Sequence, residues 1–410
     1  MKKTSLAACA LTLLLAACGT SVSPTTAPDS ASTPVTSDAE IPTEVQTQDA
    51  ESRLGDLALK APAQGSSSRV RADGTLLVGG QPMFPMGFYH VSWAGDAQKR
   101  LRDLQAIASM GFNVMNATMF DPQEDLDGYR KLLDTAQSRG VKLMIEDFNA
   151  VSIAALKSHP ATLGWMIADD CNNLITPSEL QRRHQATKAL DPDHLTYTSM
   201  AISFADSHLG YFGNADAIGN QSYPVDGGDS VGVVYPVMRK LVEQSAAKGT
   251  LPIANLQSFR WTDGRYPTPR ELNSMTNQAL AAGVKGILYY TYLDKTNDLA
   301  QYSGLNSELR KLAAEVKLLA PVLMNGERQA LTLPASVPEA RATLWSYEGR
   351  RYLQVLNLSE NDAQKLRLAL PAGSVGLTPL FAARPATLGV SSGQITGTLP
   401  ALGAQWYEVR

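Results

Sequence analysis

Acidic residues stand at the ends of two strand-like runs of this sequence, and a pair of carboxyl groups is what acid–base or nucleophilic chemistry requires. Asp170 follows the apolar run Leu163–Ala168, and Glu146 lies near the end of the run Lys142–Phe148. If these runs form neighbouring parallel strands, both carboxyl groups reach the same edge of the sheet. We therefore expect Asp170 to act as a general acid and Glu146 as a base or nucleophile, with Asp294 as a reserve carboxylate.

Alternation along the two runs predicts which way these acids point. One side of the first run is large and apolar, and the other carries smaller residues and the acid. The two sets are Leu163, Trp165 and Ile167, and then Gly164, Met166, Ala168 and Asp170. In the second run the apolar residues Val141, Leu143 and Ile145 form an outward face, which places Met144 and Glu146 inward. A crowded inner face of small residues is typical of the inside of a barrel.

Amide and aromatic side chains end the other strand-like runs, and such a lining suits a polyhydroxylated ligand. Rings stack on the C–H faces of sugars, while amides and acids bind hydroxyl groups. We expect the following residues to bind an oligo- or polysaccharide: Tyr89, Asn116, Gln221, Tyr223, Gln257, Trp261, Tyr290 and Tyr292. Each has a plainer alternative, because tyrosines also pack in cores and buried acids also bond to loop amides or to basic groups.

Other classes of chemistry have little support in the sequence. No pair of His or Cys residues has the spacing of a metal site, so we expect no catalytic metal and no cofactor. The net charge is −3 and no long basic run follows the first residues, which argues against a nucleic-acid partner. Cys171 adjoins Asp170, but no His is close in sequence, so a small buried side chain is expected rather than a nucleophile.

Eight strand-like runs alternate with helical patterns between about residues 83 and 320. The expected strands are Met83–Tyr89, Asn113–Met119, Lys142–Phe148, Leu163–Ala168, Leu195–Met200, Ala217–Tyr223, Pro252–Phe259 and Gly286–Leu293. Eight such units in roughly 250 residues predict a closed (β/α)8 TIM barrel of the α/β class. An open doubly wound sheet is the rival, but no glycine-rich phosphate turn follows the first strand.

The ends of the chain differ from the barrel. Short strand-like runs separated by turn signals predict a small antiparallel β-sandwich after Pro321. At the start, a charged Met1–Lys3, an apolar Leu6–Ala17 and small residues before Cys18 indicate an export signal. We expect a signal peptide over 1–17, a lipidated Cys18 and disordered tether over 18–68, the barrel over 69–322 and the sandwich over 323–410.

Several stretches resemble glycoside hydrolases of the retaining (β/α)8 clan, in the form of secreted bacterial lipoproteins with an appended β-sandwich. They are GQPMFPMGFYHV (Gly80–Val91), HPATLGWMIADD (His159–Asp170), LPIANLQSF (Leu251–Phe259) and YPTPRELNSMTNQALAAGVKGILYYTY (Tyr266–Tyr292). The resemblance implies an acid/base Glu ending strand four, where this chain has Asp170, and a nucleophile Glu ending strand seven, where it has Gln257.

Three hypotheses follow for an exported protein that is lipid-anchored at the bacterial cell envelope. The first is hydrolysis of O-glycosidic bonds by Asp170 and Glu146. The second, prompted by the neutral Gln257 and the shorter acid, is a degenerate barrel that binds carbohydrate or an envelope partner without cleaving it. The third is an envelope scaffold with no small ligand.

Overall fold

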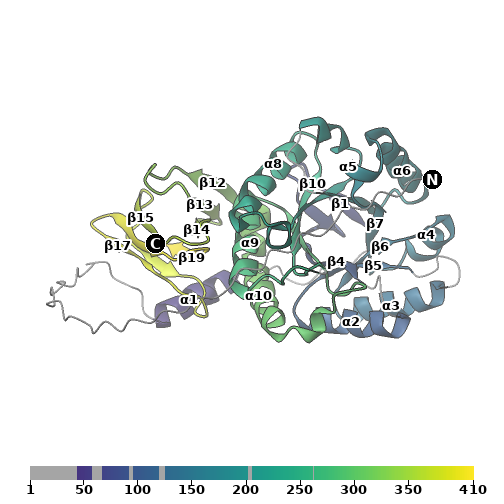
Figure 1. The fold of residues 1–410 in the computed structure, drawn as a ribbon, viewed down its shortest axis with the longest axis horizontal. Helices are drawn as coiled ribbons and strands as arrows, with labels where there is room; N and C mark the ends of the chain where they lie inside the picture. The colour runs from purple at the N-terminus through teal and green to yellow at the C-terminus, as the bar shows by residue number, and fades with distance from the viewer. Residues whose placement is uncertain (1–43, 58–66, 92–95, 120–124, 202–205, 262) are drawn as a thin grey trace, which may run out of the picture. The chain divides into compact units, whose positions relative to one another are not determined.

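A closed barrel of eight parallel strands forms the centre of the computed structural model, which describes residues 44–57, 67–91, 96–119, 125–201, 206–261 and 263–410 (Figure 1). Its strands are β4 (Met86–Val91), β5 (Val114–Thr118), β6 (Lys142–Glu146), β7 (Thr162–Ala168), β8 (Leu195–Met200), β9 (Ala217–Ser222), β10 (Leu251–Gln257) and β11 (Gly286–Tyr290). They pair in chain order, and β11 closes on β4. The predicted TIM barrel is confirmed, with every expected strand present.

Helices surround the barrel, and several begin at caps that are readable in the sequence. Thr176 and Thr268 each accept a hydrogen bond from the backbone N–H three residues on, and Pro follows at the first helical position. The helices are α2 (Ala97–Ser109), α3 (Leu126–Ser138), α4 (Ala150–Leu156), α5 (Cys171–Leu174), α6 (Pro177–Leu190), α7 (Pro224–Gly227), α8 (Val234–Ala246), α9 (Pro269–Ala282) and α10 (Ser303–Asn325). None of the helices in the described ranges is both long and apolar enough to cross a bilayer.

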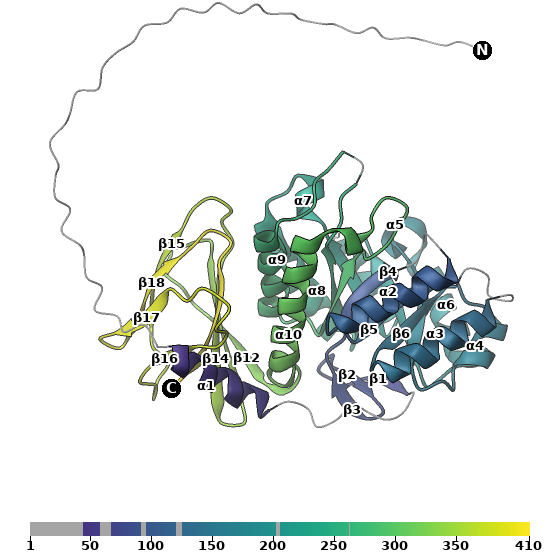
Figure 2. The same ribbon diagram turned by 90° about the horizontal axis from the view of Figure 1, so that it is seen from below.

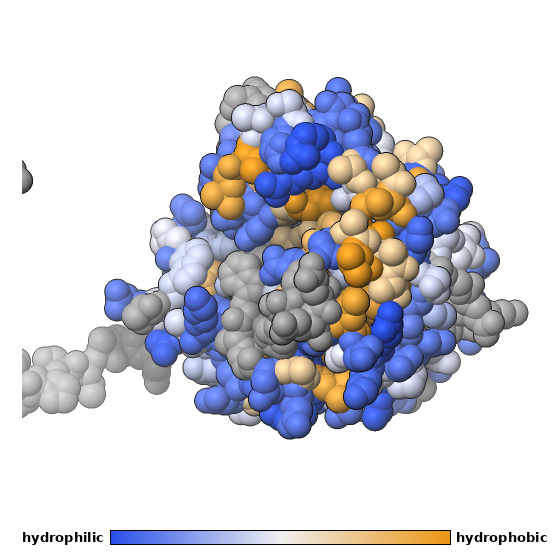
Figure 3. All heavy atoms as spheres, turned by 90° about the vertical axis from the view of Figure 1, so that its right-hand side faces the viewer, coloured by the Kyte–Doolittle hydropathy of each residue, from blue (hydrophilic) through white to orange (hydrophobic). Residues whose placement is uncertain are grey.

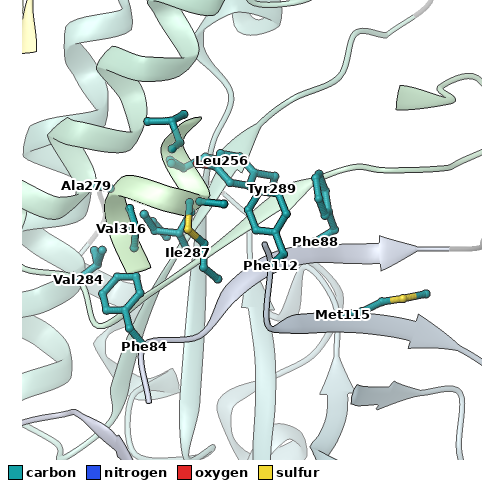
Figure 4. Close-up of a cluster of buried hydrophobic side chains, with 14 of the residues drawn as sticks. Phe84, Phe88, Phe112, Met115, Leu256, Ala279, Val284, Ile287, Tyr289 and Val316 are labelled. Carbon is teal, nitrogen blue, oxygen red and sulfur yellow. The ribbon is translucent and has the colours of Figure 1, made fainter. Parts of the chain in front are cut away.

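Two apolar clusters pack against the barrel wall, one on its outer face and one on its inner face. The outer cluster fills the space between strands and helices and includes Leu143, Ile145 and Trp165. Figure 4 shows another part of it, around Phe88 and Tyr289. The inner cluster includes Met144. The alternation expected along β6 is therefore confirmed, and Glu146 leaves the same face as Met144.

A small antiparallel sheet closes the end of the barrel opposite the strand ends. It consists of β1 (Ser68–Val70), β2 (Leu76–Val78) and β3 (Gln81–Met83). Leu76 and Val78 are fully buried and belong to the inner cluster. Figure 2 shows these strands at one end of the barrel and α7 at the other. The site at the strand ends therefore has a solid floor beneath it.

The residues after α10 form the expected β-sandwich. One sheet has the order β12-β13-β14-β19-β16 and the other β15-β18-β17. The strands are β12 (Glu327–Leu331), β13 (Ala340–Tyr347), β14 (Arg350–Asn357), β15 (Gln364–Ala369), β16 (Leu377–Pro379), β17 (Leu388–Ser391), β18 (Gln394–Leu399) and β19 (Ala404–Val409). Asn277 on α9 joins this domain to the barrel, because its Oδ1 accepts a hydrogen bond of 2.8 Å from Trp406 Nε1.

Three details correct the sequence predictions. The segment expected to be a tether contains helix α1 (Glu44–Gly55), whose Ala50 and Leu54 are buried in the outer cluster. Helix α10 runs past the expected end of the barrel domain at residue 322 and continues to Asn325, because Val322, Leu323 and Met324 extend its buried face. Strands β12 and β17 fall outside the strand-like runs of this part of the sequence, which are Arg341–Tyr347, Arg351–Leu358, Lys365–Leu370, Gly376–Phe381, Gln394–Leu399 and Ala404–Val409. The predicted signal peptide, Cys18 and the parts of the predicted tether at 19–43 and 58–66 lie outside the described residues.

Candidate active site at the barrel mouth

Asp170 and Gln221 meet at the mouth of the barrel. Asp170 directly precedes α5 and has a φ of 42°, in the left-handed region that non-glycine residues seldom adopt. Gln221 lies near the end of β9, two strands away. Its Nε2 donates to Asp170 Oδ1 at 2.5 Å and also lies 3.0 Å from Tyr89 Oη. The amide therefore fixes the acid against the inner wall.

Glu146 reaches the mouth from the neighbouring strand. It is the last residue of β6, is 7% exposed, and its Oε2 accepts a hydrogen bond of 3.2 Å from Thr118 Oγ1 on β5. Since β6 pairs directly with β7, Glu146 and Asp170 come from adjacent strands, as the sequence suggested.

Asp169 is a third carboxylate at the mouth, and it was not among the expected site residues. The register of β7 against β8 shifts between Met166 and Ala168. Met166 belongs to the inner cluster and Ala168 to the outer one, so the next residue, Asp169, turns inward. Burial raises the pKa of Tyr89 well above its ordinary value, and the negative charge of Asp169 contributes to this rise. Sequence alternation alone could not find Asp169, because it assigns the inward position to Asp170.

An aromatic wall stands beside the acids. Tyr223 and Tyr290 each have ring contacts with Phe259, at 5.0 and 4.8 Å between centroids. Trp261 lies 4.8 Å from Phe259 and is 52% exposed, which makes it the most accessible ring of the group. Tyr89 joins the wall through Tyr290 at 5.3 Å. Four of the expected ligand-binding tyrosines and tryptophans are thus brought together, and Phe259 is an addition.

Asp294 is committed to its own loop. Its Oδ1 accepts backbone hydrogen bonds from Thr296 at 2.7 Å and Asn297 at 2.6 Å, while its Oδ2 accepts one from Tyr290 Oη at 3.1 Å. Burial raises the pKa of Tyr290, and the charge of Asp294 adds to this effect. The reserve carboxylate therefore positions a ring of the aromatic wall.

Three expected ligand-binding residues have structural contacts instead. Gln257 is fully buried, with Oε1 accepting from Val225 N at 3.0 Å and Nε2 donating to Phe259 O at 3.1 Å. Asn116 is fully buried and donates to a neighbouring carbonyl at 3.1 Å. Tyr292 is 2% exposed and lies in the outer cluster, because the last barrel strand ends at Tyr290 and the chain then turns away from the axis.

A polar layer supports the mouth from below. Tyr197 Oη donates to Asn255 Oδ1 at 3.0 Å, and Asn255 Nδ2 donates to Ser199 Oγ at 3.0 Å. Gln221 Nε2 lies 3.2 Å from the same Ser199 Oγ, so this layer is continuous with Asp170. Gly219 makes room for it, since a Cβ at this position would lie 2.3 Å from Tyr197 Oη.

The thiol of Cys171 and the placement of possible metal ligands bear on two other kinds of chemistry. Cys171 is fully buried, and burial raises the pKa of its thiol to about 11, which agrees with the expectation of an inert side chain. Within the described ranges, no group of three His, Cys, Asp or Glu residues is placed to hold a metal ion.

A cavity of about 350 Å³ lies outside the barrel wall, between α4 and α6. Asp147 and Phe148, which directly follow Glu146, line this cavity. Met166 and Ile167, which shortly precede Asp169 and Asp170, line it as well. Figure 3 looks onto the face on which α4 and α6 lie and shows apolar side chains around a hollow there.

Comparison with protein-family models finds no match, and comparison with curated proteins finds none either. Solved structures are similar at the level of fold. A glycoside hydrolase of family 5 from Bacteroides vulgatus has a TM-score of 0.59 at 15% identity, covering 84% of this chain and 93% of that one. An alpha-amylase from Geobacillus thermoleovorans, solved with acarbose, gives 0.56 at 14%, covering 83% and 99%. An Anoxybacillus alpha-amylase gives 0.54 at 13%, covering 83% and 98%. The chain therefore shares its fold with these enzymes.

Proposed function

We propose that this chain is a carbohydrate-active protein that binds an oligo- or polysaccharide at the barrel mouth and hydrolyses an O-glycosidic bond there. The observation that carries the proposal is the convergence of Glu146, Asp169 and Asp170 beside an aromatic wall that ends in the exposed Trp261. Acids and rings side by side are the side chains that sugar hydroxyls and C–H faces require. The glycoside hydrolases that share the fold are consistent with this reading.

Hydrolysis divides between two carboxyl groups. One donates a proton to the glycosidic oxygen as its bond to the anomeric carbon breaks, and the other takes a proton from the attacking water or attacks the carbon itself. We assign the first role to Asp170 and the second to Glu146, as the sequence suggested. Trp261 and Tyr223 lie 6.1 Å apart between ring centroids, and the exposed Trp261 is suited to stack against a pyranose ring.

Binding without cleavage is the second candidate, and Gln257 favours it. In the clan that the sequence resembles, this strand end carries the nucleophile, whereas here it carries a neutral amide bonded to Val225 N and Phe259 O. A site with this substitution keeps its sugar-binding rings whether or not Glu146 takes over the chemistry.

Turnover of a broad panel of oligosaccharides and aryl glycosides distinguishes hydrolysis from binding without cleavage. If the chain is a hydrolase, Asp170→Asn and Glu146→Gln each lower kcat by at least about 100-fold, as loss of an acid or base group does. Asp193→Asn is a matched control, because Asp193 is exposed near the opposite end of the barrel wall. Parent-like turnover in both acid variants overturns the assignment.

Glycan affinity tests the binding site independently of turnover. Trp261→Ala removes an exposed ring, so we expect roughly tenfold weaker binding with an unchanged Tm. A ligand that binds with no turnover across the panel supports the second candidate. If the chain neither binds nor cleaves any glycan of the panel, both candidate functions are contradicted.

Export and anchoring form part of the same proposal and rest on the N-terminal sequence alone. Met1–Lys3, Leu6–Ala17 and Cys18 have the order of a lipoprotein signal. Labelled fatty acid is expected to enter the parent chain in a bacterial host and to be absent from Cys18→Ser. Label in both proteins contradicts lipidation at Cys18.

A further inference from the structure

A second cavity lies at the end of the barrel far from the mouth, where three parts of the chain meet. Its volume is about 160 Å³. The turn at Asp73 and Gly74 covers it from the β1–β2 hairpin, Lys285 reaches it from the start of β11, and Arg328 and Trp345 reach it from the β-sandwich domain. Neither the candidate active site nor the proposed function involves any of these residues.

Positive charge dominates the walls of this cavity. Lys285 and Arg328 both line it, whereas Asp73 is the single acid in the lining. Asp73 is already paired, because Arg71 donates to its two carboxylate oxygens at 2.9 and 2.8 Å. The cavity and its immediate neighbour Arg71 therefore carry three cations against one anion. Arg239 and Glu243 on α8 lie beyond Arg328 and cancel each other as an ion pair.

The two cations have partners that neutralise them only in part. Lys285 Nζ donates to Leu323 O at 2.8 Å, near the C-terminus of α10, and Arg328 Nη1 donates to Ala281 O at 3.0 Å, near the C-terminus of α9. A helix C-terminus carries roughly half a negative charge, so part of each unit of positive charge remains. Burial lowers the pKa of Lys285; the charge of Asp73 acts in the opposite direction, and the charges of Arg71 and Arg328 lower the pKa further.

Trp345 supplies a second and independent observation. Its side chain lines the cavity and is 2% exposed, and its indole Nε1 has no hydrogen-bond acceptor among the described residues. Buried indole N–H groups ordinarily have a partner. A cavity with partly neutralised cations and an unsatisfied donor is suited to an acceptor that carries negative charge.

We propose that this cavity is a binding site for a small oxyanion of the phosphate, sulfate or carboxylate type. Such an ion has four or five heavy atoms, and a cavity of about 160 Å³ has room for it. Lys285 and Arg328 supply charge, and Trp345 supplies a neutral donor. The ion would connect β11 of the barrel with β12 and β13 of the sandwich, so its binding would stabilise the junction between the two domains.

Thermal unfolding of the full chain with inorganic phosphate or sulfate, against sodium chloride at matched ionic strength, tests the proposal. At low millimolar concentration we expect one of the two oxyanions to raise Tm by about 2 to 4 °C over chloride, with saturation. Acetate in a third arm distinguishes a carboxylate site from one for tetrahedral ions. Isothermal titration with the same salts measures the affinity directly.

Variants separate a built site from a general salt effect. Lys285→Met and Arg328→Met are expected to abolish the oxyanion-specific shift, and Trp345→Phe, which keeps an aromatic ring in the core, is expected to weaken affinity several-fold. Lys317→Met removes an exposed lysine of α10 and should leave the shift unchanged. If Lys285→Met does not fold, Trp345→Phe and Arg328→Met show whether the oxyanion-specific shift depends on the cavity. An equal effect of chloride in the parent, or a shift that persists in the cavity variants, overturns the proposal. Neither result depends on whether the barrel mouth is active.

Discussion

Gln221 Nε2 donates to Asp170 Oδ1 at 2.5 Å, and this contact ties the strand-four acid to the polar layer inside the barrel. The same amide reaches Tyr89 and Ser199, so one side chain coordinates an acid, a ring of the aromatic wall and the supporting layer. The orientation of Asp170 therefore depends on a residue that belongs to a different strand and takes no part in proton transfer.

Replacing Gln221 with Met removes the amide while keeping the volume of the side chain. We expect kcat/KM, or glycan affinity if the chain only binds, to fall about 10- to 100-fold, because Asp170 loses a hydrogen bond to a charged group. Gln257→Met is the matched control, since its amide bonds only to backbone groups in the described contacts and its loss should lower Tm rather than activity. Unchanged activity in Gln221→Met contradicts the positioning role.

Gly219 is expected to tolerate no side chain. A Cβ there would lie 2.3 Å from Tyr197 Oη and 2.6 Å from Asn255 Oδ1, inside the polar layer. Gly219→Ala should therefore reduce the free energy of unfolding by about 1 to 3 kcal/mol, which a shift of the urea midpoint measures. Gly304→Ala, near the start of α10 with no atom within 4 Å of the added Cβ, should have no such effect. Equal stability of the two variants contradicts the packing described.

Asp191 is expected to contribute an acid-sensitive part of the stability. Burial alone would raise its pKa, but hydrogen bonds from His194 and Trp165 outweigh burial and hold the pKa below its ordinary value. A lowered folded-state pKa gives stability that is present above about pH 4 and is lost as pH falls through the folded pKa.

Thermal unfolding from pH 7 to pH 3 checks this expectation. Asp191→Asn should lower Tm at pH 7, because the buried carboxylate that bonds to His194 and Trp165 is replaced by an amide. Below pH 4 the Tm of this variant should fall less steeply than that of the parent. Asp193→Asn alters a neighbouring exposed acid and should follow the parent curve. Parallel acid limbs for parent and Asp191→Asn would show that Asp191 does not contribute.

Arg384 is expected to hold the sandwich domain to α10. It contacts Glu308 at 2.6 Å and Glu315 at 2.6 Å, and all three side chains are largely buried. Arg384→Met leaves two buried carboxylates without their cation, so we expect a loss of about 3 to 5 kcal/mol in calorimetry. Arg367→Met, on the exposed side of β15, should change stability little. A parent-like Tm for Arg384→Met contradicts the proposed junction.

The sequence predicts the barrel well because its strands are apolar runs bounded by glycines and helix caps. Alternation along β6 places Glu146 correctly, since that strand is regular up to its end. Along β7 the same reasoning fails by one position, because a register shift before Ala168 turns Asp169 inward as well. A bulge of this kind is determined by the neighbouring strand and leaves no mark in local periodicity.

Other differences arise where tertiary contacts decide the structure. Helix α1 has a polar sequence and looks like a tether, yet Ala50 and Leu54 bury against the body and Arg53 pairs with Glu408. Tyr292 was expected at the mouth because strand periodicity was extended past Tyr290, where β11 ends. Nothing in the local sequence marks that end.

The hairpin sheet beneath the barrel has one more consequence. Because Leu76 and Val78 are buried in the interior at this end, the barrel is closed at the bottom and opens only at the mouth. A long polymer cannot thread through it, so any chain-like ligand has to lie across the rim. Both fragments of a cut chain would then depart by the same side from which the intact chain arrived.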